Sequence, residues 1–266
     1  MLEITGACKV FSSGTPTEHV ALDHLNLTLR DGEFVTVVGS NGAGKSTLFN
    51  AICGTFLLDE GKIVLDGTDI TYMKEHKRAF SIGRVFQDPM KGTAPNLTIE
   101  ENIALAYSRK KGASLRFALN KKDQAVFREA LAGFQMGLED RMKQPVGLLS
   151  GGQRQALTLL MATMNCPKLL LLDEHTAALD PATADKVLEI TKEVVEKNHI
   201  TTLMVTHNMQ QALNLGNRIL MMDAGRIVFD VQGEKKKSMT TDDLLRQFQV
   251  NAGKALDNDR ILLSND

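Results

Sequence analysis

The chain has 266 residues, and its 31 Lys and Arg residues nearly balance its 32 Asp and Glu residues, for a formal net charge of −1 at pH 7. This balance argues against a polycation that grips nucleic acid, and we expect no nucleic-acid partner. With 43% hydrophobic and 24% charged residues, the composition is that of a globular protein and excludes a disordered or fibrous chain. No apolar run approaches the ~18 residues of a membrane span, so any membrane role requires a partner.

The first strongly predicted elements are a strand, a glycine-rich loop and a helix. Residues 34–38 read FVTVV, which is typical of a buried strand, and the later STLFNAIC has helical spacing. Between them, GSNGAGKST matches G-x-x-x-x-G-K-[ST] in the setting that this phosphate-binding motif requires. Its glycines let backbone N–H groups converge on phosphate oxygens, and the helix N-terminus adds a positive dipole end. The predicted nucleotide-binding residues are Gly39, Ser40, Asn41, Gly42, Ala43, Gly44, Lys45, Ser46 and Thr47.

Two acids after a second apolar strand complete the predicted chemistry. Residues 169–174 read LLLLDE, so Asp173 and Glu174 stand at the carboxyl end of a buried strand. We expect Lys45 to reach the β- and γ-phosphates, and Ser46 and Asp173 to hold Mg²⁺, directly or through water. Glu174 then faces the γ-phosphate and orients the attacking water. Together the loop and the acids predict hydrolysis of a nucleoside triphosphate.

The remaining pattern predicts an α/β fold. Strand-like runs at 63–65, 168–172, 201–205 and 219–222 and a helical stretch at 181–197 predict a core around a largely parallel sheet. Residues 219–230 predict an antiparallel hairpin. Helical spacing dominates the middle of the chain, and we predict a helical subdomain at about 89–152 inserted in a domain of residues 1–230, with 231–266 as a short C-terminal extension.

The cysteines and histidines predict no metal centre of their own. Cys8, Cys53 and Cys166 form no CxxC pair, and we expect all three to be buried thiols. No histidine has metal-ligand spacing to a nearby cysteine or acid, so no zinc site is predicted.

A second anion-binding element is predicted at residues 148–164, which read LLSGGQRQALTLLMATM. A Ser-Gly-Gly-Gln turn opens an amphipathic helix there and offers free N–H groups and a hydroxyl to an anion. Because the chain already has one phosphate loop, this helix start makes sense if it closes on a nucleotide held by another copy. The predicted contacts are Ser150, Gly151, Gly152 and Gln153.

Taken together, these motifs resemble the ABC ATPase family over about residues 2–230. LSGGQ at 149–153 resembles the family signature, and Ala178-Leu179-Asp180 resembles the D-loop. Gln87 in VFQDP, His207 in MVTHN and Phe11 resemble the Q-loop glutamine, the switch histidine and the aromatic residue that stacks on adenine. The resemblance implies a P-loop NTPase core with a mostly parallel sheet, an antiparallel β part and an inserted helical subdomain. It also implies ATP and Mg²⁺ as cofactors, catalytic roles for Glu174, His207, Gln87 and Lys45, and Gln87 as a further Mg²⁺ ligand.

The resemblance implies the ATP-binding subunit of an ABC transporter. Two copies are expected to enclose two MgATP and to drive a separate membrane-spanning permease, docked at about residues 88–102, on the cytoplasmic face of the membrane. A solute-binding protein is expected in the complex. The segment DEHTAALD departs from the commonest pattern, with His175 where Pro is usual and Ala177 where Ser or Asn is usual. This leaves the shape of the contact between copies in doubt, and it resembles a bacterial uptake subgroup linked to amino acids, including aromatic ones.

Two other classes of protein share part of this pattern. Asn120 to Asp123 spell NKxD, the guanine-reading motif of small GTPases, but no core strand precedes them, and the only DxxG, Asp230 to Gly233, comes later. We therefore interpret Asp123 as a helix cap. A non-transport ABC ATPase, such as an iron–sulfur assembly ATPase, also has a single cassette, and the length of the chain does not separate it from a transporter subunit.

Overall fold

The structure is a computed structural model that describes residues 1–111 and 121–252. The chain divides into two units, one made of residues 1–79 with 199–266 and the other of residues 80–198. Within the described ranges, no helix combines the length and the apolar character that crossing a bilayer requires.

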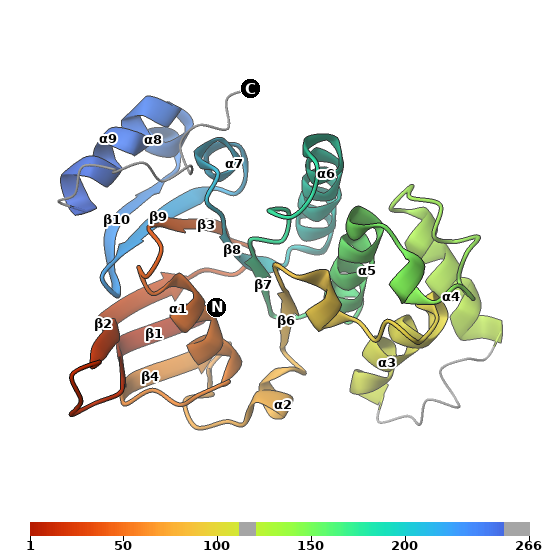
Figure 1. The fold of residues 1–266 in the computed structure, drawn as a ribbon, viewed down its shortest axis with the longest axis horizontal. Helices are drawn as coiled ribbons and strands as arrows, with labels where there is room; N and C mark the ends of the chain where they lie inside the picture. Colours follow the sequence, from red (N-terminus) through yellow and green to blue (C-terminus); the bar gives the residue numbers. More distant parts are fainter. Residues whose placement is uncertain (112–120, 253–266) are drawn as a thin grey trace. The chain divides into compact units, whose positions relative to one another are not determined.

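The first unit contains an antiparallel sheet of four strands, seen in Figure 1 as the red and orange arrows. These are β1 (Leu2–Phe11), β2 (His19–Leu29), β4 (Glu60–Leu65) and β5 (Thr68–Asp69), in the order β2-β1-β4-β5. Only β4 was predicted from the sequence. The long strand β1 was missed because shifts in its register with both neighbours break the alternation of buried and exposed residues that identifies a strand.

A second set of strands in this unit carries the glycine-rich loop. Strand β3 (Phe34–Gly39) is fully buried and runs parallel to β8 (Thr201–Val205) on one side and β9 (Arg218–Asp223) on the other. Strand β10 (Arg226–Gln232) pairs antiparallel with β9 and forms the predicted hairpin. The predicted α/β class, with parallel strands and an antiparallel part, is confirmed.

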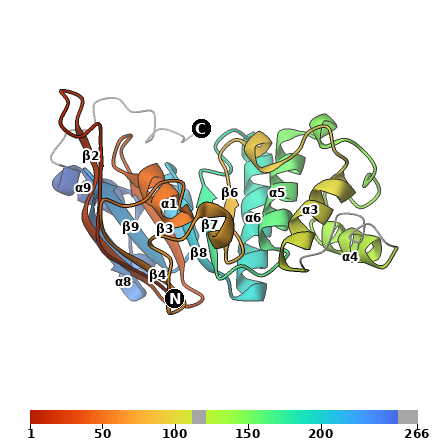
Figure 2. The same ribbon diagram turned by 90° about the horizontal axis from the view of Figure 1, so that it is seen from below.

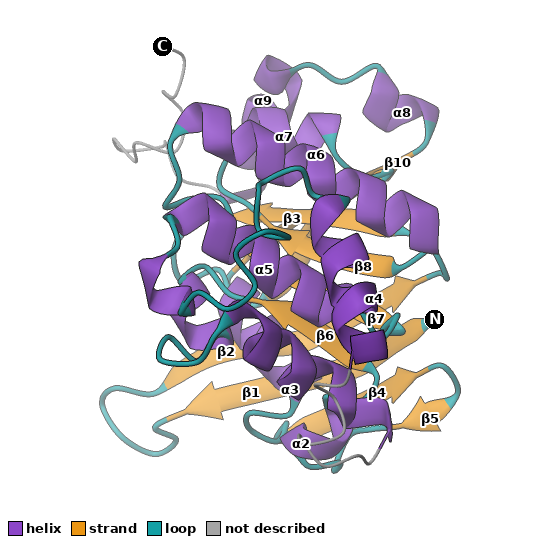
Figure 3. Cartoon of the chain, turned by 90° about the vertical axis from the view of Figure 1, so that its right-hand side faces the viewer, coloured by secondary structure: helices purple, strands orange, loops and turns teal. Residues whose placement is uncertain are grey.

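Five helices complete the first unit within the described residues: α1 (Lys45–Cys53), α2 (Glu75–Arg78), α7 (Met209–Asn214), α8 (Glu234–Lys237) and α9 (Thr241–Ala252). Helix α9 lies beside α7, as Figure 3 shows. It buries Leu244 and Phe248 in one apolar cluster with Val38, Ile219 and Met221. Part of the segment expected as an extension thus belongs to a hydrophobic core; its last residues, 253–266, lie outside the described residues.

The second unit is mostly helical. Strands β6 (Ile82–Val85) and β7 (Leu169–Asp173) pair in parallel. The helices are α3 (Ile99–Lys111), α4 (Lys121–Ala132), α5 (Gly151–Thr163) and α6 (Pro181–Asn198), with 3-10 turns η1 (Pro89–Gly92) and η3 (Val146–Leu148). Helix α5 contacts each of the other three helices (Figure 2). Asp123 lies inside the first turn of α4 and not at its cap, whereas Asn120 lies outside the described residues.

Candidate nucleotide-binding site

The glycine-rich loop runs from the end of β3 to the start of α1. Gly44 has φ of +98°, and a Cβ atom there would lie 2.5 Å from the carbonyl oxygen of Ala21. At Gly39 a Cβ atom would lie 2.4 Å from the carbonyl oxygen of Met222. Both positions therefore exclude any larger residue, which explains these two glycines of the motif.

Lys45 is buried beneath this loop. Its ammonium group donates hydrogen bonds to the carbonyl oxygens of Gly39, at 2.7 Å, and Ser40, at 2.9 Å. The turn of the β9–β10 hairpin supports the loop from outside, because the amide of Gly225 donates to the carbonyl oxygen of Ala43 at 3.1 Å. Ser46, at the first turn of α1, is exposed. The loop is thus formed and carries a fixed positive charge before any anion binds.

Phe11 and His207 are the other predicted site residues of the first unit. Phe11 ends β1 with 38% of its surface exposed, and it packs edge-on against Phe56 with 5.4 Å between ring centroids. A half-exposed aromatic ring can stack on a flat ligand. His207 is half-buried between β8 and α7, whose first turn is capped by the side chain of Asn208.

In the second unit, Asp173 is the last residue of strand β7 and Glu174 follows it, so both acids stand at the carboxyl end of the strand as predicted. The carboxylate of Asp173 forms an ion pair with Arg84 of the neighbouring strand β6, at 3.1 Å. Sequence reasoning missed Arg84, although a charge inside the apolar run of β6 is a usable signal. Glu174 has φ of +46°, in the left-handed region that costs a non-glycine residue about 1–3 kcal/mol. Such strain is found where the surrounding structure fixes a functional side chain.

His175, the departure noted in the sequence, is fully buried. Its Nε2 lies 3.1 Å from the hydroxyl oxygen of Thr191, and that hydroxyl donates to the carbonyl oxygen of Val187 at 2.7 Å. Because the hydroxyl proton is already used, Nε2 carries the imidazole proton and donates it to Thr191. Burial lowers the pKa of His175 to about 4, so the ring is neutral at pH 7.

Asp180 connects this region to helix α6. Its carboxylate accepts from the amide of Thr183 at 3.1 Å, which caps the helix. Hydrogen bonds from the hydroxyl and the amide of Thr183 lower the pKa of Asp180 below its usual value. The segment from His175 to Asp180 is thus held at both ends. At one end the imidazole of His175 is buried, and at the other the carboxylate of Asp180 caps helix α6.

The signature helix α5 begins at the predicted place. Ser150 and Gln153 form a capping box, in which the serine oxygen accepts from the amide of Gln153 and the glutamine oxygen accepts from the amide of Ser150. The amide of Gln153 is therefore already bonded, contrary to the expectation of free donors. Ser150 and Gly151 are exposed, and Gly152 is packed so closely on Thr183 that a Cβ atom would lie 2.0 Å from its methyl group.

Gln87 is exposed just beyond β6, and helix α5 supports its backbone. The buried side chain of Gln155 donates to the carbonyl oxygen of Phe86 at 3.2 Å. The phosphate loop, Phe11 and His207 thus lie in the first unit, and Gln87, Asp173, Glu174 and the signature residues lie in the second.

This strand–loop–helix with its buried lysine defines a phosphate-loop nucleotide-binding protein. The family model for ABC transporters matches residues 22–177. The chain belongs to the ABC transporter family, as an ATP-binding subunit whose ATPase activity is coupled to transport.

Three bacterial relatives are transport subunits by name. The chain is 43% identical over 249 residues to the tyrosine transport ATP-binding protein of Clostridioides difficile, covering 94% of this chain and 99% of that protein. It is 37% identical to the spermidine/putrescine import ATP-binding protein PotA of Haemophilus ducreyi and 36% identical to the methionine import ATP-binding protein MetN of Corynebacterium efficiens. The matches cover 79% and 85% of this chain, and the chain spans only 53% and 61% of those two longer proteins.

Solved structures give the same family. The dimeric post-hydrolysis state of the ATP-binding cassette MJ0796, bound to ADP and Pi, matches with a TM-score of 0.75 and 28% identity over 87% of this chain and 98% of that chain. The ADP conformation of the cassette MJ1267 matches with a TM-score of 0.76 and 26% identity, over 94% and 98% of the two chains.

The buried imidazole predicts a specific pH dependence of stability. The pKa of His175 is about 4 in the folded chain, whereas an unfolded histidine has its pKa near 6.5. The unfolded state therefore binds a proton that the folded state does not, so the free energy of unfolding falls as pH drops from 6.5 to 4. Protonation of His175 is expected to lower the free energy of unfolding by about 3 kcal/mol over this pH range. His175→Gln removes this pH-dependent loss.

Urea unfolding of the wild type and of His175→Gln, repeated between pH 7.5 and 4, measures this difference. His19→Gln, at an exposed histidine, controls for the loss of one histidine. Parallel curves of unfolding free energy against pH for the wild type and His175→Gln would contradict a buried neutral imidazole.

Proposed function

We propose that this subunit binds MgATP between two copies of itself and hydrolyses it to power the import of amino acids through a separate permease. Two features of one chain carry the proposal: the glycine-rich loop with its buried lysine in the first unit, and the exposed start of α5, with Ser150 and Gly151, in the second. A self-contained site needs only the first of these. The cassette MJ0796, which resembles this chain, was solved as a dimer.

The phosphate loop would hold the triphosphate. Backbone N–H groups of the loop and the N-terminus of α1 would donate to phosphate oxygens, and the buried ammonium of Lys45 lies at the same loop. Thr47 would contact the α-phosphate, and Phe11 would stack on adenine. These residues bind and orient the nucleotide.

The proposed magnesium ligands fit the ion by their chemistry. The Ser46 hydroxyl, the Gln87 amide oxygen and the Asp173 carboxylate all offer the hard oxygen donors that Mg²⁺ prefers. Asp173 also pairs with Arg84 at 3.1 Å, which balances part of its charge. When bound, the ion would neutralise charge on the phosphates.

Glu174 would act on the water that attacks the γ-phosphate. Its backbone has φ of +46°, and the next side chain, His175, is buried, so the backbone that carries this carboxylate is held by its surroundings. His207 would donate to the γ-phosphate and sense its loss. Ser150 and the glycines after it, from the partner copy, would close on the same phosphate, so that hydrolysis removes the bridge between copies and switches the dimer between two states.

Helix α5 provides a route from this phosphate to a permease. The Arg154 guanidinium bonds the Met90 sulfur of η1 and also the carbonyl oxygens of Gly147, at 3.1 Å, and Leu149, at 3.3 Å. Arg154 therefore links the signature turn to the segment of residues 88–102, where Met90 is 42% exposed. We propose this segment as the docking surface for the permease, which would hold the subunit on the cytoplasmic face of the membrane together with a solute-binding protein.

The solute class rests on the relatives. The tyrosine transport subunit covers nearly the whole chain, and the methionine import subunit is a further amino-acid relative. Both names support an amino acid as the solute, and the tyrosine name supports the aromatic class. Both are transport subunits, which favours transport over the iron–sulfur assembly alternative.

Glu174→Gln is expected to lower ATP hydrolysis by about 10²–10⁴-fold while leaving ATP bound, because only the proton-accepting carboxylate is lost. Phosphate release and the retention of labelled ATP on a desalting column measure the two properties. Glu193→Gln, at an exposed position on α6, is the matched control and keeps full activity. Hydrolysis by Glu174→Gln at the wild-type rate would refute the role of Glu174.

The solute proposal predicts which ligand stimulates the complex. In vesicles that contain the co-purified permease and its solute-binding protein, tyrosine or phenylalanine is expected to raise ATP hydrolysis severalfold. Spermidine and sulfate, tested at the same concentration, are expected to have no effect. Stimulation by either of these and not by an aromatic amino acid would overturn the solute class without touching the ATPase proposal.

A further inference from the structure

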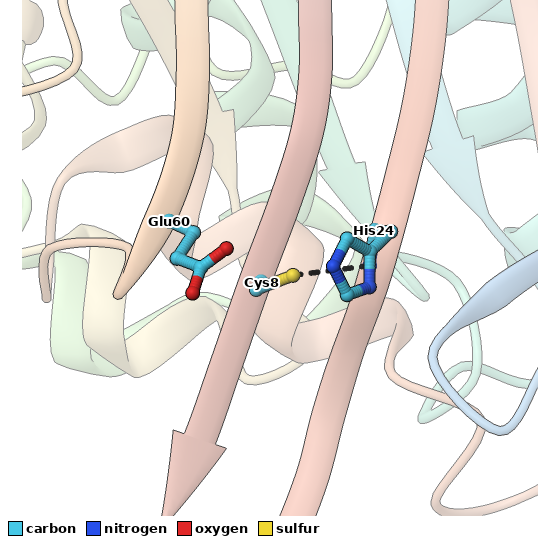
Figure 4. Close-up of side chains that lie close together, drawn as sticks. All are labelled: Cys8, His24 and Glu60. Atoms are coloured by element: carbon cyan, nitrogen blue, oxygen red, sulfur yellow. Dashed lines mark hydrogen bonds between the residues drawn. The ribbon is translucent and has the colours of Figure 1, made fainter.

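Three strands of the antiparallel sheet bring together a thiol, an imidazole and a carboxylate. Cys8 lies on β1, His24 on β2 and Glu60 on β4, and one ligand atom from each lies within 4.8 Å of the other two. Figure 4 shows His24 and Glu60 on opposite sides of Cys8. Cys8 and Glu60 are direct register partners, although the three residues are distant in sequence. Spacing along the chain therefore did not predict this cluster.

The backbone is irregular at this cluster. The register of β1 shifts next to Cys8 against both neighbours, between Ala7 and Lys9 with β2 and between Thr5 and Cys8 with β4. His24 has φ of +48°, in the left-handed region that few non-glycine residues adopt, although histidine, asparagine and aspartate do so more often than the rest. Bulges redirect side chains, and strained residues are concentrated at functional sites.

His24 is oriented as metal-bound histidines are. Its Nδ1 lies 2.8 Å from a carboxylate oxygen of Asp23, whose other oxygen pairs with Arg226 at 2.7 Å. Arg226 donates to that second oxygen of Asp23 through its Nε as well, at 2.8 Å, so the carboxylate is held against the imidazole from the other side. This arrangement places the imidazole proton on Nδ1 and leaves Nε2 as a ligand. In Figure 4 a ring nitrogen of His24 faces the sulfur of Cys8.

Cys8 is the buried member of the cluster. The backbone N–H of His24 donates to its sulfur at 3.2 Å, a hydrogen bond that a metal-bound thiolate can keep. Cys8 and Cys53 are buried as predicted, whereas Cys166 is exposed, because it lies in a turn after α5 with φ of +45°. Cys166 therefore serves as an internal control for thiol chemistry.

We propose that Cys8, His24 and Glu60 bind a zinc-class divalent cation, with water as the fourth ligand. Sulfur, nitrogen and oxygen donors in one set suit Zn²⁺, whereas Mg²⁺ and Ca²⁺ take oxygen ligands. Bonds of roughly 2.0–2.3 Å at tetrahedral angles place ligand atoms about 3.5 Å apart, so the side chains must close by about 1 Å. His24 and Glu60 are exposed, which leaves room for that movement. The prediction of no zinc site is replaced by this proposal.

The site is placed to act on nucleotide binding. Strand β1 continues for three residues beyond Cys8 to Phe11, the proposed adenine contact. A cation that joins β1, β2 and β4 would stabilise the sheet that carries Phe11, because a ligand that binds only the folded state adds stability by mass action.

The test uses the metal alone on the full chain. Zn²⁺ is titrated against a chromophoric chelator, and Co²⁺ is added in parallel to reveal the thiolate-to-cobalt absorption band. We expect one Zn²⁺ per chain for the wild type and for Cys166→Ser. Cys8→Ser is expected to weaken binding at least 100-fold and to remove the cobalt band, whereas Asp23→Asn weakens binding 10- to 100-fold.

A further variant distinguishes loss of the metal ligand from loss of the fold. His24→Asn keeps a residue that tolerates the left-handed backbone but loses the imidazole, and it too is expected to lose Zn²⁺ while melting near the wild-type temperature. The proposal is overturned if the wild type binds no Zn²⁺, if Cys8→Ser binds it as tightly as the wild type, or if Cys166→Ser is the variant that loses the cobalt band. None of these results bears on ATP hydrolysis.

Discussion

The close packing of the phosphate loop is the constraint on which the rest of the molecule depends. At Gly39 and Gly44 the neighbouring carbonyl oxygens of Met222 and Ala21 leave no space for a side chain. The loop can therefore curl over Lys45, whose ammonium is buried against two carbonyl oxygens. Those oxygens carry only partial negative charge, whereas a triphosphate supplies full charges. Strand order, hairpin and helix α1 are thus arranged around a preformed anion site.

In the second unit, helix α5 connects the predicted site residues. Its N-terminus presents Ser150, its next turn fixes the backbone beside Gln87 through Gln155, and Arg154 joins the signature turn to η1. These three contacts belong to one helix. If a phosphate binds at its start and a permease docks at residues 88–102, as proposed, α5 is the element that joins the two sites.

Local signals made part of this structure predictable. The strand before the loop, the hairpin after Met222 and the acids after β7 are each contained in one short segment, and the structure has them there. Strand β1 was missed because its bulges erase the period of two. Arg84, the buried state of His175 and the cluster around Cys8 depend on partners on other strands or helices, which spacing along one segment does not reveal.

We propose that two copies of this chain must meet to complete each hydrolytic site. The most direct measurement is the specific ATPase activity of the isolated subunit from nanomolar to tens of micromolar protein, with the mass of the particle determined by light scattering at the upper concentrations. A shared site predicts that activity per chain rises with concentration and levels off as dimers dominate. Constant activity per chain across the whole range, in a particle that stays monomeric, would contradict the account.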